Sequence, residues 1–220
     1  MKTTSSTVFV SDLGKQAFCE YELYLRDVRG ITDPGSAAED EGRLIHAALD
    51  SANAIENSAL AAQRRASGKP VPSSIEDVVS IVRAEQQPMS IRDVVVKGTR
   101  LYGRIDQVDF TPSAIRIIDD KPPSPNGIPF IDDTRQVQGY CLAFGQQRPG
   151  TGLPLVAVIR DRNNGKELWS KPFTAGDALE IEEVIDRILG IRFGKRDAMP
   201  TRNPRKCARC SWNRHCDRRS

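Results

Sequence analysis

The chain has 220 residues, of which 39% are hydrophobic and 28% charged, which is enough apolar material for one globular domain and excludes a disordered tail. It contains no run of about 18 uncharged apolar residues and no N-terminal apolar core followed by a cleavage site, so we expect a cytoplasmic protein without a membrane span or signal peptide. The formal net charge is +3, but the last 20 residues carry +6 and the rest −3. A basic end on a slightly acidic body indicates contact with a polyanion.

The first part of the chain predicts helices. Ser11 and Asp12 can cap a first helix, and Thr32-Asp33-Pro34-Gly35 breaks the pattern after it. Apolar residues at helical spacing then continue in two further stretches, which a polar linker over 67–74 separates. The expected helices are 11–28, 39–66 and 75–86.

After Pro88 the spacing of apolar residues changes from that of a helix to that of strands. Two β-rich runs, 94–110 and 114–121, flank Thr111-Pro112-Ser113 and predict a hairpin. Further along, a turn signal at Arg162-Asn163-Asn164-Gly165 separates two more strands. Beyond 121 we expect a helix over 133–144, strands over 153–161 and 166–173, and a helix over 176–195. This order predicts an α/β or α+β domain with a central mixed sheet flanked by helices.

Three of the five cysteines, Cys207, Cys210 and Cys216, form C-x2-C-x5-C in the basic tail. Such crowding in a chain without an export signal is typical of thiolate metal ligands, and zinc and iron–sulfur sites alike usually take four ligands. Three residues could supply the fourth. His215 is adjacent to Cys216, Cys141 lies in an apolar helical context typical of a small buried hydrophobe, and Cys19 lies in the first helix. We favour Cys19, which would join the two chain ends; a local zinc site using His215 is the alternative.

An acidic cluster follows from strand alternation. Asp119 and Lys121 share one face of the strand 114–121, while Asp120 points the other way. Asp106, in Gly103-Arg104-Ile105-Asp106, would face Asp119 from the neighbouring strand. Two carboxylates with open positions suit Mg²⁺ or Mn²⁺, and Lys121 could position or deprotonate a water or stabilise charge on a phosphate. The alternative is a set of solvated acids at strand ends.

Two helical pairs add to this cluster. Gly42 and His46 are one turn apart, so another element can approach the imidazole, which suits either a third metal ligand or a core or capping histidine. Gln136 and Tyr140 are also four apart and offer polar tips for phosphate or base contact, or form an ordinary polar face.

The motifs described above follow one another in an order that resembles a known family. An early cysteine, G-x-x-x-H, G-x-x-D, D-x-K, Q-x-x-x-Y and C-x2-C-x5-C follow one another between Ser11 and Cys216. This order resembles the RecB-like branch of the PD-(D/E)XK nucleases that carry a four-cysteine [4Fe–4S] cluster, and most closely its small CRISPR-associated exonucleases. The stretch 51–98 matches only in being helical.

The resemblance implies a single restriction-endonuclease-like domain over 1–220. Its parts would be an N-terminal helical part (1–90), a nuclease core (91–195) and a cluster-binding segment (196–220). Lys121 would be the catalytic lysine and Gln136 and Tyr140 the pair that contacts DNA and supports the site. A catalytic Mn²⁺ or Mg²⁺ would be bound by His46, Asp106, Asp119 and the Asp120 carbonyl, and the cluster by Cys19, Cys207, Cys210 and Cys216.

The implied activity is exonucleolytic cleavage of single-stranded DNA ends or overhangs, in fragments destined for CRISPR arrays, with the CRISPR integrase as partner. The implied cluster is structural, and homo-oligomers occur among relatives without any residue here demanding one. Two departures from the family pattern stand out: Asp119 replaces the commoner glutamate, and Pro122-Pro123 follows the lysine. The alternatives are the same chemistry in DNA repair or phage recombination, and a non-catalytic DNA-binding scaffold stabilised by zinc.

Overall fold

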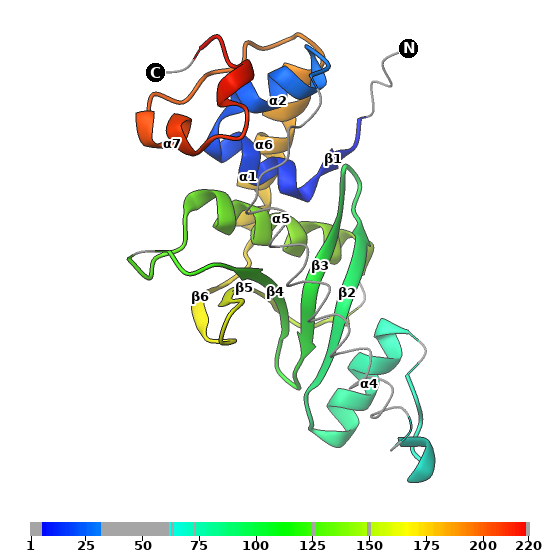
Figure 1. The fold of residues 1–220 in the computed structure, drawn as a ribbon. Coiled ribbons are helices and arrows are strands. Elements are labelled where there is room, and N and C mark those ends of the chain that lie inside the picture. The colour runs from blue at the N-terminus through cyan, green and yellow to red at the C-terminus, as the bar shows by residue number, and fades with distance from the viewer. Residues whose placement is uncertain are drawn as a thin grey trace.

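A six-stranded mixed sheet lies at the centre of the molecule (Figure 1). The computed structural model describes residues 6–31, 62, 64–72, 74–124, 126–148 and 151–218. The strands are β1 (Val8–Phe9), β2 (Met89–Lys97), β3 (Leu101–Phe110), β4 (Ile115–Lys121), β5 (Leu155–Asp161) and β6 (Glu167–Pro172).

The sheet runs β2-β3-β4-β5-β6, and only β4 and β5 in this series are parallel. The short strand β1 pairs in parallel with Leu101 and Tyr102 at the start of β3. The ladder between β3 and β4 covers the far end of β3, from Gln107 to Phe110. The stretch of β3 between these two pairings, where Asp106 lies, is therefore next to the end of β4.

Helices cover one face of this sheet in two layers. They are α1 (Val10–Phe18), α2 (Glu20–Asp27), α4 (Ile75–Glu85), α5 (Ile131–Gln147), α6 (Ala175–Arg192), α7 (Pro204–Arg209) and the 3-10 turn η2 (Asn213–His215). The helix α5 packs on β2, β3, β4 and β5, and α1 and α6 pack against α5 from outside (Figure 1). The helix α4 contacts β3 at the opposite end of the molecule from α7 (Figure 1).

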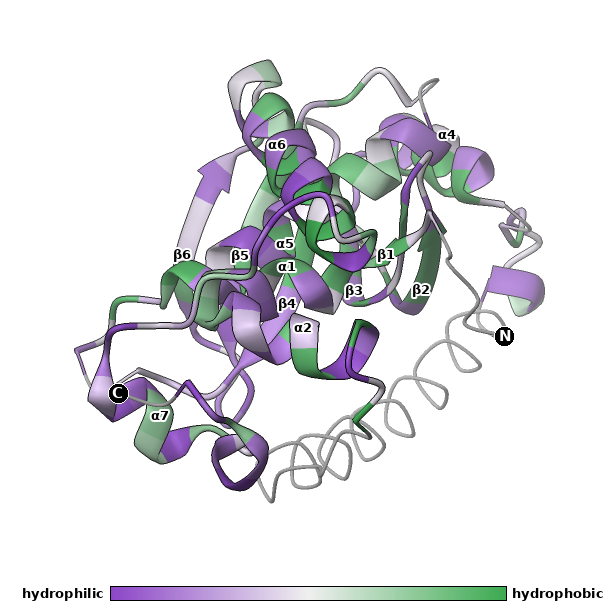
Figure 2. Cartoon of the chain, turned by 90° about the horizontal axis from the view of Figure 1, so that it is seen from above, coloured by the Kyte–Doolittle hydropathy of each residue, from purple (hydrophilic) through white to green (hydrophobic). Residues whose placement is uncertain are grey.

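The main hydrophobic core lies between the sheet and these helices, and a second, smaller cluster lies beneath the C-terminal segment. Residues of α5, α6 and the strands form the main core. Hydrophobic and hydrophilic residues alternate along α6, which has one side toward the core (Figure 2). The second cluster is formed by Tyr21, Leu25 and Trp212. The apolar content of α2 is thus buried partly by a residue almost 200 positions away in sequence.

The expected mixed α/β architecture is confirmed, but the first helix is not continuous. Cys19 is extended, with φ of −165°, and divides the expected helix 11–28 into α1 and α2. The carbonyl oxygens freed by this break accept hydrogen bonds from Lys206. The expected cap was also wrong: Phe9 precedes the first turn, and Asp12 is buried in an ion pair with Arg26.

The structure has one more strand than the sequence predicts in the region after Pro88. The run 94–110 contains two strands, because the chain turns at 98–100 and β2 begins as early as Met89. The hairpin between β3 and β4 is confirmed. The helix α4 ends at Glu85, one residue before the expected end of 75–86, with Ser74 as its N-cap, whereas α5 is longer than 133–144 at both ends.

The helix expected over 39–66 lies outside the described residues, apart from 62 and 64–66, which are helical. Among the helices that the structure describes, none combines the length and hydrophobicity that crossing a membrane requires.

Candidate active site

The two central carboxylates lie where β3 and β4 part. The paired residues of β3 and β4 run from Phe110 opposite Ile115 to Gln107 opposite Ile118. Asp106 and Asp119 are the next residues on the two strands, just past the point where the pairing stops. Asp106 Oδ2 accepts a hydrogen bond from the backbone N–H of Asp120 at 2.7 Å. This hydrogen bond from backbone to side chain continues the contact between the strands where their backbone pairing has ended. It holds the Asp106 carboxylate beside the backbone of Asp119 and Asp120.

The two buried carboxylates face a single positive charge, the ammonium group of Lys121. Asp119 is 2% exposed, and its Oδ2 makes no hydrogen bond with any residue of the described ranges. Burial raises the pKa of Asp119 to about 7, with Lys121 opposing the rise and Asp106 adding to it. Burial also raises the pKa of Asp106, against the effect of the Asp120 N–H. Two buried carboxylates that repel each other in this way are suited to a divalent cation.

Lys121 projects into the same space from the end of β4. Its Nζ lies 3.1 Å from Asp119 Oδ2, out of line for a hydrogen bond, and donates to Gln136 Oε1 at 3.2 Å. Asp133 Oδ1 is 3.9 Å away. Burial lowers the pKa of Lys121, but Asp119, Asp133 and Asp106 outweigh it and raise the pKa overall. The side chain is therefore an ammonium ion in the absence of a metal.

Gln136 and Tyr140 lie on α5, one turn apart, and form a chain of contacts behind Lys121. Gln136 Nε2 donates to Tyr140 Oη at 3.4 Å, and Tyr140 is only 6% exposed. Burial, Asp119 and Asp106 raise the pKa of Tyr140, so it remains a neutral phenol. The alternative of an ordinary exposed polar face is wrong for Tyr140.

A glycine makes room for this tyrosine. A Cβ on Gly103 would lie 2.8 Å from Tyr140 Cε1, closer than real Cβ contacts come. The G-x-x-D motif therefore has a steric meaning here: its glycine admits the ring of Tyr140, and its aspartate is the first carboxylate of the site.

Asp120 points away from the other acids, as strand alternation predicts. Its carboxylate binds Arg160 of β5 through two bonds of 2.6 and 2.9 Å, and Arg92 of β2 lies 3.4 Å from Oδ2. The Asp120 side chain is 1% exposed. Its side chain is thus fully engaged, which leaves only the main chain of Asp120 for the site.

The structure brings together Asp106, Asp119, Lys121, Gln136 and Tyr140; His46 lies outside the described residues. The sequence analysis missed Asp133, although it begins the expected helix 133–144. Its spacing of three from Gln136 places both on one helix face, and this spacing is the signal that could have found it.

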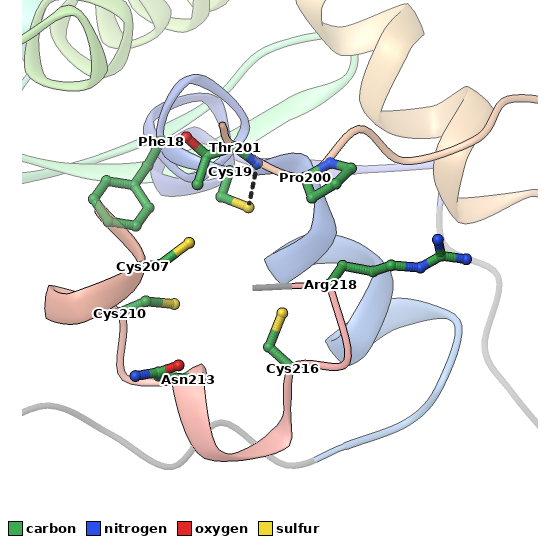
Figure 3. Close-up of a pocket in the computed structure, with 9 residues that line it drawn as sticks. All are labelled: Phe18, Cys19, Pro200, Thr201, Cys207, Cys210, Asn213, Cys216 and Arg218. Carbon is green, nitrogen blue, oxygen red and sulfur yellow. Dashed lines mark hydrogen bonds between the residues drawn. The ribbon is translucent and has the colours of Figure 1, made fainter. Parts of the chain in front are cut away.

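The cysteines of the early helix and the tail line one pocket. Cys19, Cys207, Cys210 and Cys216 face a common space, with Cys19 from the α1–α2 junction opposite the other three (Figure 3). Burial raises the pKa of Cys210 to about 11, with smaller contributions from Glu22, Cys19 and Cys216. No set of three or more His, Cys, Asp or Glu side chains in the described residues is arranged to hold a single metal ion.

The two other candidates for the fourth thiol position are not in this pocket. His215 is exposed and does not line it, and Cys141 is fully buried in the main core, as its apolar context predicts. The backbone N–H of Thr201 donates to Cys19 Sγ at 3.3 Å. Of the three candidates, only Cys19 lies with the tail cysteines.

Protein contacts also join the N- and C-terminal segments around the pocket. Lys206 Nζ donates to the carbonyls of Ala17 and Phe18 at 3.0 and 3.3 Å. Glu20 accepts from the backbone N–H of Met199 and pairs with Arg187, and Tyr21 Oη donates to Asp217 at 2.6 Å. The pocket therefore lies in a seam that both segments build.

The chain is similar to known proteins over most of its length. No curated protein matches it. The solved structures that match include the crystal structure of SSO0001, at 15% identity and a TM-score of 0.49, covering 98% of this chain and 88% of that one. They also include an alkaline exonuclease from Laribacter hongkongensis, at 14% identity and a TM-score of 0.35, covering 86% and 89%. The family model for the PD-(D/E)XK nuclease superfamily matches residues 10–217, and the chain therefore belongs to that superfamily.

Proposed function

We propose that this chain is a metal-dependent DNA exonuclease that hydrolyses phosphodiester bonds at single-stranded DNA ends. One observation carries the proposal: Asp106, Asp119 and Lys121 converge at the end of the β3–β4 ladder, in a chain of the PD-(D/E)XK nuclease superfamily. Carboxylates beside an ammonium group suit phosphoryl chemistry, in which negative charge must be both neutralised and oriented.

The donor set fits a catalytic Mn²⁺ or Mg²⁺. Asp119 offers a buried oxygen without a hydrogen bond in the described part of the chain, and Asp106 is held next to it by the Asp120 N–H. These carboxylates would bind the ion together with the Asp120 carbonyl and His46. When bound, a divalent ion supplies an activated water and neutralises charge on the leaving group.

The remaining side chains orient one another. The ammonium group of Lys121 would stabilise charge that develops on the scissile phosphate, or position the attacking water. Gln136 Oε1 accepts a hydrogen bond from Lys121, and Gln136 Nε2 donates one to Tyr140 Oη, which orients the amide. We therefore assign Gln136 and Tyr140 as supports of the catalytic lysine, with Gln136 the one nearer to DNA.

The substrate assignment rests on charge and on the resemblance. Backbone phosphates supply most of the non-specific affinity for DNA, and the tail after Thr201 is strongly basic. The motif order favours processing of DNA fragments for CRISPR spacer acquisition, with the integrase as partner. Co-purification with that integrase, and trimming of its DNA substrate to integration length, would test this role; their absence would favour repair or phage recombination.

We also propose that Cys19, Cys207, Cys210 and Cys216 hold a [4Fe–4S] cluster with a structural role. Four cysteine thiols around one space fit a four-thiolate group, and the thiols line this space rather than meet at one point (Figure 3). A cluster there would bind the tail to the α1–α2 junction. A zinc-loaded, colourless preparation would instead favour the scaffold alternative.

The decisive experiment compares linear and circular single-stranded DNA in the presence of Mn²⁺. We expect the wild type to degrade end-labelled linear DNA and to spare the circle, because an exonuclease needs an end. Asp106→Asn, Asp119→Asn and Lys121→Met should each lose at least about 100-fold in rate while still binding DNA. Asp109→Asn is the matched control, since Asp109 lies on the same strand but bonds Ser90. Binding without cleavage by the wild type would support the scaffold; activity that survives all three changes would refute the site.

A further inference from the structure

Three large hydrophobic side chains are exposed in the connection between β4 and α5. Ile128, Phe130 and Ile131 are 71%, 47% and 56% exposed. The connection projects from the sheet toward the side on which α7 lies (Figure 1). Exposed hydrophobic residues gathered in one place indicate a binding surface, because single ones are normally scattered. We refer to these three residues as the apolar loop.

The apolar loop is joined to the catalytic residues at both ends. It belongs to the connection that leaves β4 at Lys121 and enters α5 at Ile131, and α5 carries Asp133 and Gln136 within 3.9 and 3.2 Å of the Lys121 ammonium group. A ligand that rests on these side chains therefore lies on the segment that joins the residues of the candidate site.

The backbone presents these side chains in a fixed way. Gly127 takes a left-handed conformation, with φ of +68°, and its N–H donates to the Ser124 carbonyl at 3.0 Å. The Ser124 hydroxyl donates to the Ile128 carbonyl, and the Phe130 carbonyl accepts the first helical bond of α5, from Thr134. The outward position of Ile128 and Phe130 is thus determined by backbone hydrogen bonds.

A basic side chain continues the surface from the loop along α5. Ile131 and Arg135 are one helical turn apart and line the same groove between α5 and α6. The other charged residues of this groove are Glu180, Glu183, Arg196 and Arg187, which is paired with Glu20. Gln16 of α1 holds the Arg135 guanidinium through a bond of 2.7 Å. Apolar or aromatic side chains followed by guanidinium groups are what single-stranded DNA requires, because its bases stack and its phosphates are anionic.

We propose that the apolar loop stacks against unpaired nucleobases next to the scissile phosphate, with Arg135 contacting the phosphate that follows. The inference rests on the proposed nuclease function and deepens it by naming the surface that selects single strands. Paired bases in a duplex hide their faces, so they cannot stack on Phe130. The loop thus favours unpaired ends through stacking, without reading their sequence.

The test separates bases from phosphates. The probes are an oligothymidine and an abasic oligonucleotide of equal length, which carries the same phosphates but no bases. The wild type should cleave oligothymidine with the higher kcat/KM, and the combined change Ile128→Ala and Phe130→Ala should reduce this preference by about 5- to 150-fold, the value of stacking one base. Leu179→Ala, which removes an equally exposed side chain from α6, should keep the preference.

A second measurement does not depend on cleavage. Phe130→Trp in an Asp119→Asn background should show fluorescence quenching by oligothymidine but not by the abasic strand, beyond the change seen with Asp119→Asn alone. An unchanged base preference in the double variant, or equal quenching by both strands, would overturn the proposal. Self-association that the double variant abolishes would do so too, because a second copy would then occupy the loop. If the wild type cleaves no DNA, the proposed function fails, while quenching still decides the stacking inference.

Discussion

The backbone N–H of Asp120 donates to the carboxylate of Asp106 across the point where β3 and β4 separate, at 2.7 Å. The position of one acid of the site thus depends on the backbone of the residue that follows the other. The backbone of Asp120 is held in place in turn, because the Asp120 side chain forms an ion pair with Arg160 on the opposite face of the sheet.

We predict that Arg160→Met weakens both the fold and metal binding. It leaves the buried Asp120 carboxylate with Arg92 alone, and breaking a buried ion pair costs about 3 kcal/mol. Mn²⁺ titration followed by calorimetry should show a higher Kd. Arg116→Met is the control, since its pair with Glu167 is exposed and should change the free energy of unfolding by less than about 1 kcal/mol. Equal effects of the two changes would contradict a supporting role for Arg160.

We predict that Asp119 contributes a loss of stability to the metal-free protein as pH rises toward neutral. The pKa of Asp119 is about 7 in the folded state and about 3.9 in an unfolded chain. Between these values the native state keeps a proton that the unfolded chain has released, so the free energy of unfolding falls with pH, by a few kcal/mol at most, and levels off above pH 7.

Urea titrations in the presence of a chelator, from pH 4 to pH 8, measure this slope. Asp119→Asn should show a shallower fall, since its amide does not titrate. Adding Mn²⁺ at pH 8 should stabilise the wild type more than the variant, because the ion binds the folded carboxylates. A slope that is the same in both proteins would mean that Asp119 is not the group responsible.

We predict that Gly103→Ala impairs catalysis. The new Cβ would lie 2.8 Å from the Tyr140 ring, which must move and release Gln136, and with it Lys121. The kcat should fall at least about tenfold, whereas KM for DNA should change little. Gly176→Ala is the control, because its Cβ would have ordinary contacts in the first turn of α6 and should stabilise the helix by up to about 1 kcal/mol.

We predict that Cys207→Ala yields colourless, poorly soluble protein when it is purified anaerobically. The tail around Cys207 has little apolar content, and Trp212 is the one tail residue in the second hydrophobic cluster that is almost fully buried. The wild type should be brown, with broad absorbance near roughly 400 nm. Cys141→Ala removes a thiol from the main core and should keep the colour. A Cys207→Ala protein that melts like the wild type would show that no bound group joins the segments there.

The sequence predicts most of this site, because strand alternation alone places Asp119 and Lys121 on one face and Asp120 on the other. It does not predict the seam, since contacts between residues such as Tyr21 and Asp217 depend on how two distant segments pack. Neither the break at Cys19 nor the early start of α5 is visible in helical periodicity, because both follow from tertiary contacts. Asp133 was missed because its approach to Lys121 depends on how α5 packs on the end of β4.

The hydrogen bonds that Lys206 makes with the end of α1 have a consequence for biosynthesis. The first helices can form early, but the carbonyls of Ala17 and Phe18 lack the ammonium group of Lys206 until that residue has left the ribosome. Synthesis of the middle of the chain therefore proceeds without these two hydrogen bonds, and the seam forms only after residues 199–217 have emerged. A nascent-chain proteolysis series should show protection of this junction appearing last.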